Sequence, residues 1–185
     1  NYCRNAHIAG NIVDTAFGSG IVAQGGKSGK DGQGYDIPLI RLLVHHNKIE
    51  YTALGVNDYG GLALWQGGPT YAWSNNVGNS PGHMPAGFRG SGPINLSYPL
   101  YLDGAFKQYC FNNIIWGRTT DKADPFANTT SGYFMVFGFL NQFVGNTLYR
   151  QAKGTGGSSG NRNDIVGNIF AEVSDYFIAS NRIGD

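Results

Sequence analysis

The feature that most constrains the fold of this chain is an asparagine that recurs along its whole length. Each one is preceded by a short strand-like segment and followed by a mostly apolar stretch. Intervals of tens of residues between similar units are typical of proteins built from stacked coils. The repeated asparagines are Asn11, Asn47, Asn76, Asn113, Asn146 and Asn168.

A second set of similar segments lies between these asparagines, at residues 20–25, 61–67, 99–104 and 133–138. The repeat unit is therefore strand, turn, strand, asparagine turn, short strand and a loop of variable length. Asparagine suits such turns because it tolerates the left-handed backbone conformation, and stacked asparagine side chains pair in ladders. The sequence predicts an all-β solenoid of about six coils.

The composition agrees with short strands joined by turns. Glycine accounts for 29 of the 185 residues and charged residues for only 14%, which argues against a helix bundle. A β-sandwich with unrelated turns has a similar composition and is the alternative fold. We expect one unit over residues 1–185, with projecting loops near 25–36, 78–97, 118–131 and 153–163. The glycine-rich start of the last loop is expected to be flexible.

The first coil starts in the middle of a repeat and the last one ends without a clear cap. Solenoids need caps because bare ends expose apolar side chains and open strand edges. We therefore expect the chain to be a segment of a longer solenoid, or to assemble with a further chain that caps it.

The charge balance excludes some partners. The net charge of +1 provides no basic excess for nucleic acid or an anionic membrane, and no run of 18 apolar residues predicts a membrane span. Cys3 and Cys110 are the only cysteines, and two cysteines leave the redox compartment and their pairing open. Nothing in the sequence indicates a cofactor.

Several motifs occur in a recognisable order. Residues 57–65 read Asn-Asp-Tyr-Gly-Gly-Leu-Ala-Leu-Trp, followed by Ser-Asn-Asn-Val at 74–77, Tyr-Leu-Asp-Gly at 101–104 and Phe-Asn-Asn-Ile-Ile-Trp at 111–116. This order resembles right-handed parallel β-helix proteins of the carbohydrate-active kind. The resemblance implies a right-handed solenoid that is secreted or on the cell surface, with carbohydrate as its partner. Such proteins include glycoside hydrolases, polysaccharide lyases, epimerases and adhesins, so the fold does not settle the reaction.

Asp58 and Asp103 are the leading catalytic candidates. Acidic residues are scarce here, these two lie in successive coils, and the resemblance points to the same positions. Glycoside hydrolysis needs two carboxylates that flank the scissile bond, and coils about 4.8 Å apart can place them there. In the alternative interpretation Asp58 caps a turn and Asp103 bonds backbone at a strand end. Asp14 is a possible third carboxylate or a turn residue.

Lys107 and Arg89 support a different reaction, β-elimination from a uronate. That reaction needs a base for the C5 proton and a cation for the enolate-like anion. In the alternative interpretation, which is the commoner case, each residue is a solvated surface charge.

Aromatic and histidine side chains supply the candidate substrate contacts. Tyr59 and Trp65 lie next to the candidate carboxylates, and exposed rings suit the apolar faces of sugars. His46 and His83 are candidate bases or substrate contacts. The scattered histidines have no metal-site spacing, so no metal is expected. The leading hypothesis is a glycoside hydrolase. The alternatives are a uronate lyase and a structural or adhesive solenoid subunit without enzymatic activity.

Overall fold

The computed structural model describes residues 5–24, 41–82, 97–121, 131–158 and 162–177. The described residues form three six-stranded sheets, and every strand pairs in parallel with the strand of the same position in the next coil. The prediction of a parallel β-solenoid of about six coils is confirmed, and the sandwich alternative is wrong.

Each coil contributes one strand to each sheet. Sheet A contains β1 (Asn5–Ala9), β4 (Arg41–His45), β7 (Thr70–Trp73), β10 (Gln108–Phe111), β13 (Gln142–Val144) and β16 (Asp164–Val166). Sheet B contains β2 (Ile12–Asp14), β5 (Lys48–Glu50), β8 (Asn76–Gly78), β11 (Ile114–Trp116), β14 (Thr147–Tyr149) and β17 (Ile169–Ala171). Sheet C contains β3 (Ile21–Gln24), β6 (Tyr59–Gly67), β9 (Ser97–Ala105), β12 (Ser131–Val136), β15 (Lys153–Ser158) and β18 (Asp175–Phe177).

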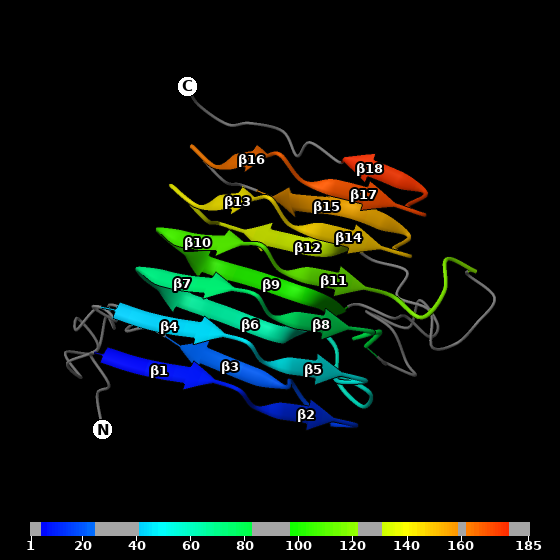
Figure 1. Cartoon of the computed structure of the whole chain (residues 1–185), viewed down its shortest axis with the longest axis horizontal. Helices are drawn as coiled ribbons and strands as arrows, with labels where there is room; N and C mark the ends of the chain where they lie inside the picture. The colour runs from blue at the N-terminus through cyan, green and yellow to red at the C-terminus, as the bar shows by residue number, and fades with distance from the viewer. Residues whose placement is uncertain (1–4, 25–40, 83–96, 122–130, 159–161, 178–185) are drawn as a thin grey trace, which may run out of the picture.

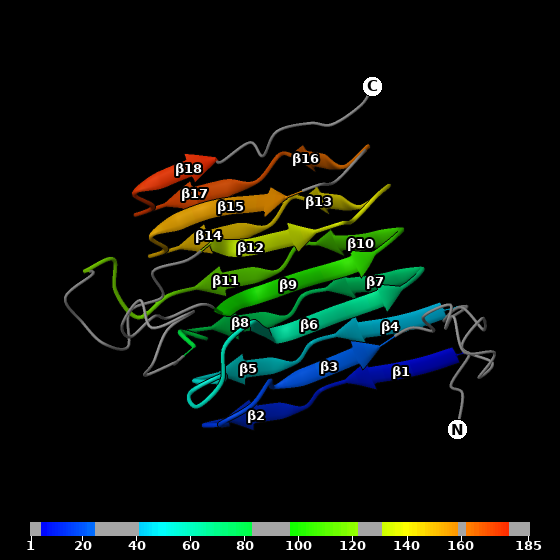
Figure 2. The ribbon, with the colours of Figure 1, turned by 180° about the vertical axis from the view of Figure 1, so that it is seen from behind.

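The coil is right-handed, as expected for parallel strands joined by crossovers. In Figure 1 the chain runs to the right along β1 and β2 on the near side, then returns along β3 on the far side one level higher. Figure 2 shows the reverse side, where the strands of sheet C lie in front.

The core is a column of apolar side chains that point into the coil. Alternate residues of a strand point to opposite faces, so each strand contributes every second residue. Because the strands are stacked in register, similar side chains lie above one another from coil to coil. The fully or nearly fully buried members include Val44, Ile49, Leu62, Leu64, Leu100, Leu102, Ile115, Phe143 and Leu148.

An asparagine ladder lines the turn between sheets A and B. The Asn113 side chain donates to the oxygen of Asn146 at 2.9 Å and to the carbonyl of Ala72 at 3.0 Å. Its own oxygen accepts from the backbone and side-chain nitrogens of Asn75 at 3.0 and 2.9 Å. The ladder satisfies buried polar groups that would otherwise be costly to desolvate. Its members are Asn11, Asn47, Asn75, Asn113, Asn146 and Asn168.

One member of this ladder differs from the prediction. The third rung is Asn75 and not Asn76, because the Asn75 side chain bonds Asn113 and the carbonyl of Val44 inside the coil. Asn76 is the first residue of β8, where its side-chain oxygen accepts from Trp116 at 2.7 Å. Neighbouring residues at a strand start point to opposite faces, so only one of the two can join the ladder.

The prediction of a projecting loop at 153–163 is wrong for the first part of that range. Lys153–Ser158 forms β15 and pairs with β12 and β18. Glycines fit here because the adjacent strand approaches closely: a Cβ at Gly156 would lie 2.5 Å from Ser131 Oγ, and one at Gly157 would lie 2.8 Å from the carbonyl oxygen of Met135. The glycine content therefore reflects close backbone packing and not a flexible linker.

The other expected loops lie largely outside the described residues. The described residues contain no helix of the length and apolar character that a membrane span requires.

Candidate functional site

A pocket of about 250 Å³ lies on the outer face of sheet C in the first three coils. It brings together four of the residues that the sequence singled out, namely the two carboxylates and the two aromatic residues beside them. Its described lining consists of Val22, Asn57, Asp58, Tyr59, Ala63, Leu64, Trp65, Tyr101 and Asp103.

Strand alternation and register build this pocket. Tyr101 and Asp103 are two residues apart on β9, so their side chains share a face. The register places Ala63 beside Tyr101 and Trp65 beside Asp103 on the adjacent strand β6. The small Ala63 leaves space between these larger side chains. The pocket is therefore a consequence of two neighbouring strands carrying large and small side chains at matched positions.

Asp58 enters the pocket from the turn before β6. Its φ is +58°, a left-handed conformation that aspartate tolerates better than most residues. The same conformation recurs at many turns of this solenoid, so it gives Asp58 no special status. The specific feature is a hydrogen bond of 2.9 Å, which the Tyr101 hydroxyl donates to Asp58 Oδ1.

Tyr101 is held firmly and remains a hydrogen-bond donor. Only 7% of it is exposed, and its ring packs against Tyr98 and Phe134 with centroid distances of 5.0 and 6.0 Å. Burial, and then the charge and hydrogen bond of Asp58, raise the pKa of Tyr101 well above its ordinary value, and the charge of Asp103 adds to this. The hydroxyl therefore stays protonated at neutral pH. Both carboxylates therefore interact electrostatically with this tyrosine.

A glycine makes this arrangement possible. A Cβ at Gly60 would lie 2.8 Å from the Cβ of Tyr101 and 3.0 Å from the carbonyl oxygen of Leu62. Any larger residue at this position would displace the tyrosine that orients Asp58.

The two aromatic residues at the rim have accessible surface. Tyr59 is 44% exposed and Trp65 is 38% exposed. Neither makes a ring contact with another aromatic residue in the described part of the chain. Trp65 lies directly beside Asp103 in the sheet, so a ring and a carboxylate border the same space.

The structure does not bring Lys107 or His46 to this pocket. Lys107 is exposed in the turn between β9 and β10, where its backbone nitrogen donates to the carbonyl of Phe139 at 3.3 Å. His46 is exposed at the turn between sheets A and B, with its Nδ1 2.7 Å from Nδ1 of His45. Neither is among the described residues that line the pocket. His83 and Arg89 lie outside the described residues.

Asp14 is also separate from the pair. It is exposed on β2 in sheet B, opposite Glu50, and accepts a hydrogen bond of 2.8 Å from the hydroxyl of Thr15. Asp14 is the last residue of β2, so it belongs to a different sheet from Asp103 and is no third carboxylate of the same face.

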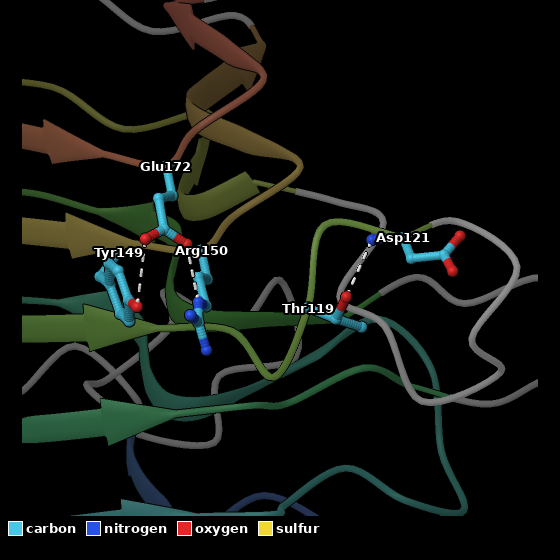
Figure 3. A network of polar contacts seen from close by, with 5 residues as sticks. All are labelled: Thr119, Asp121, Tyr149, Arg150 and Glu172. Atoms are coloured by element: carbon cyan, nitrogen blue, oxygen red, sulfur yellow. Dashed lines mark hydrogen bonds and ion pairs between the residues drawn. The ribbon is translucent and has the colours of Figure 1, made fainter.

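Figure 3 shows two further acidic side chains, Glu172 and Asp121, which do not contact each other. Glu172 pairs with Arg150 at 2.8 Å and accepts from the Tyr149 hydroxyl at 3.4 Å. The hydrogen bond from Arg150 is the main cause that lowers the pKa of Glu172. Asp121 points away from this pair (Figure 3). Among the residues that the structure describes, no group of three His, Cys, Asp or Glu side chains could hold a metal ion.

The outer face of sheet A carries the other concentration of rings. His45 stacks on Trp73 with centroids 4.1 Å apart, and Trp73 stacks on Phe111 at 5.8 Å. Tyr71 and Tyr109 form a parallel stack at 5.0 Å. Two open grooves of about 410 and 490 Å³ run beside these stacks and contain no acidic residue among their described lining.

Tyr101 is a residue of the candidate site that sequence reasoning missed. The signal was present, because Tyr101 and Asp103 are two residues apart within a predicted strand and therefore share a face. Its bond to Asp58 joins residues 43 positions apart, and nothing in the local sequence indicates that pairing.

Comparison with known proteins adds no family: no protein-family model, curated protein or solved structure matches this chain. The fold and the pocket therefore carry the functional argument.

Proposed function

We propose that this protein is a carbohydrate-active enzyme that hydrolyses glycosidic bonds of a poly- or oligosaccharide at the sheet C pocket. One observation carries the proposal: Asp58 and Asp103 line the same pocket as the exposed rings of Tyr59 and Trp65. Two carboxylates provide an acid and a base or nucleophile, and exposed rings bind the apolar faces of sugars. The repeat motifs of the coils, which resemble those of carbohydrate-active β-helix proteins, support the same class.

The two carboxylates have different surroundings. Asp58 is exposed and accepts a hydrogen bond from the buried Tyr101 hydroxyl, whereas Asp103 is half-buried and lies beside Trp65 in the sheet. In the reaction one of them protonates the leaving oxygen and the other serves as base or nucleophile.

The test is release of new reducing ends from a panel of neutral and charged polysaccharides. Asp58→Asn and Asp103→Asn should each lower the rate by about 10² to 10⁴, the usual contribution of acid or base catalysis. Asp14→Asn is the matched control, because Asp14 lies on sheet B and outside the pocket lining. Its activity should stay within twofold of the original protein. Equal activity of all three variants would overturn the proposal.

The same assay tests the two alternatives. A uronate lyase would release unsaturated products that absorb ultraviolet light, and Lys107→Ala would abolish them. A structural or adhesive solenoid would cleave no substrate, and the Asp58 and Asp103 variants would behave like the control.

A further inference from the structure

The charge of the sheet C pocket restricts the sugars that it can accept. Asp58 and Asp103 are the only charged side chains in its described lining, and both are acidic. A uronate would bring a further negative charge to this acidic lining, at a cost that grows as the site excludes water. A ligand with a positive charge would be attracted instead. The charge of the lining thus favours cationic over anionic sugars.

The aromatic residues point to the same kind of ligand. A cation over the face of a tryptophan or tyrosine ring is attracted by the negative face of the ring. Trp65 and Tyr59 have exposed rings without an aromatic partner in the described chain. Trp65 also stands beside Asp103, so the same cation can contact a ring and lie near a carboxylate. This combination of rings and acids is the usual environment of a bound ammonium group.

Tyr101 keeps the pocket selective for a cation. Its hydroxyl stays protonated and its hydrogen is directed to Asp58, so it does not provide a donor for an anionic group. The volume of about 250 Å³ lies below the ~300 Å³ lower end that is typical of pockets for larger ligands. It therefore matches a single sugar unit.

We infer that the substrate is an amino sugar with a free, protonated amine, such as a glucosamine unit within an oligosaccharide. This inference rests on the proposed function, because it names the sugar that the same pocket would bind. The ammonium group lies over Trp65 or Tyr59 and close to Asp103, and the ring stacks at the rim. An N-acetylated sugar lacks the charge and binds more weakly, and a uronate binds least.

Calorimetric titration with three oligosaccharides of equal length tests this inference. The probes are oligomers of glucosamine, N-acetylglucosamine and galacturonate, measured at low salt and below the pKa of the sugar amine. The glucosamine oligomer should bind at least tenfold more tightly than the N-acetylated one. Raising the salt concentration or the pH above the amine pKa should reduce this preference.

Variants show which carboxylates cause the preference for the amine. Asp58→Asn and Asp103→Asn should each reduce the preference for the amine to threefold or less, whereas Asp14→Asn should leave it unchanged. Thermal melting shows that each variant is folded. Equal affinity for the glucosamine and N-acetylglucosamine oligomers, or no binding of any probe, would overturn the inference.

The outcomes separate this inference from the proposed function. Cleavage of a neutral glycan without any preference for amines would leave the hydrolase standing and remove the amino sugar. Binding of the amine without cleavage of any glycan would leave the amino sugar as a ligand and remove the hydrolase.

Discussion

The outer faces of sheets A and C both carry aromatic rings, but the stacked rings of sheet A differ in their surroundings from Trp65 on sheet C. On sheet A, His45, Trp73 and Phe111 occupy the same register position in successive coils and stack face to face. On sheet C, the strand neighbours of Trp65 are Gln24 on one side and Asp103 on the other. The rings of sheet A therefore cover one another, whereas neither strand neighbour of Trp65 is an aromatic residue that could cover its ring.

In our proposal this difference separates a stabilising surface on sheet A from a binding surface on sheet C. Stacked rings gain energy from each other and expose mainly their edges. A ring between polar neighbours keeps a face for a ligand and stands beside the groups that would react with it. The grooves on sheet A are larger than the sheet C pocket, but they lack carboxylates in their described lining. Chemistry, and not volume, identifies the candidate site.

The largest effect on stability is expected from the asparagine ladder, which holds together the coils that carry both faces. Asn113→Ala removes buried hydrogen bonds to Asn75, Asn146 and the carbonyl of Ala72. We expect a loss of about 3 kcal/mol in the free energy of unfolding, measured by denaturant titration, because the abandoned partners stay buried. Asn11→Ala at the exposed first coil is the control and should cost less than about 1 kcal/mol. Equal losses would show that the ladder does not act through burial.

Exchanging Trp73 or Trp65 for alanine tests the comparison directly. Trp73→Ala should lower stability by about 1–2 kcal/mol, because it removes stacking on both His45 and Phe111, and should leave sugar affinity unchanged. Trp65→Ala should weaken sugar binding by roughly tenfold, which corresponds to about 1.4 kcal/mol, with little change in stability. Unfolding curves measure the stability of both variants, and calorimetric titrations measure their sugar affinity. The distinction between the faces fails when both variants change the same property.

A smaller effect is expected from one hydroxyl group. Tyr101→Phe keeps the buried ring but removes the hydrogen bond to Asp58. We expect a five- to tenfold loss of turnover, about 1 kcal/mol, because Asp58 is exposed and water partly replaces the donor. Tyr109→Phe, in the ring stack of sheet A, is the matched control and should leave turnover unchanged. The melting temperatures of both variants should stay close to that of the original protein.

The smallest effect concerns pH and lies on sheet A. Partial burial, followed by the charges of His7 and His46, lowers the pKa of His45 below 6.5. The unfolded chain therefore binds a proton at His45 more readily than the folded chain does, so stability falls as the pH drops through 6.5 toward the folded pKa. Above pH 6.5 both states are neutral at this residue and the contribution is absent.

Thermal melts between pH 7.5 and 5 measure this contribution. His45→Gln should remove a fall of no more than about 2 °C over that range. Turnover at the sheet C pocket should not distinguish the variant from the original protein at pH 7.5. An unchanged pH profile of stability in the variant would contradict the assignment to His45.

Much of this architecture follows from the sequence alone. The recurring asparagines define six coils because a turn of this kind needs a residue that tolerates its backbone and bonds its neighbours. The scarcity of acidic residues directs attention to Asp58 and Asp103, which do line one pocket. These features are local, so the residues themselves specify them.

Other features depend on what lies one coil above or below. Sequence cannot decide between Asn75 and Asn76, because the choice depends on which side chain meets Asn113 across the sheet. The glycines of β15 read as a linker until the close approach of Met135 and Ser131 is known.

The site shows the same division. The sequence supplied the two carboxylates and the two rim aromatics, but only the stacked coils brought Tyr101 to Asp58 and kept Lys107 out of the pocket lining. Strand partners in adjacent coils are separated by 22 to 41 positions along the chain, yet the strands lie only about 4.8 Å apart. The chain determines its own repeat, and the register between coils decides which side chains become neighbours.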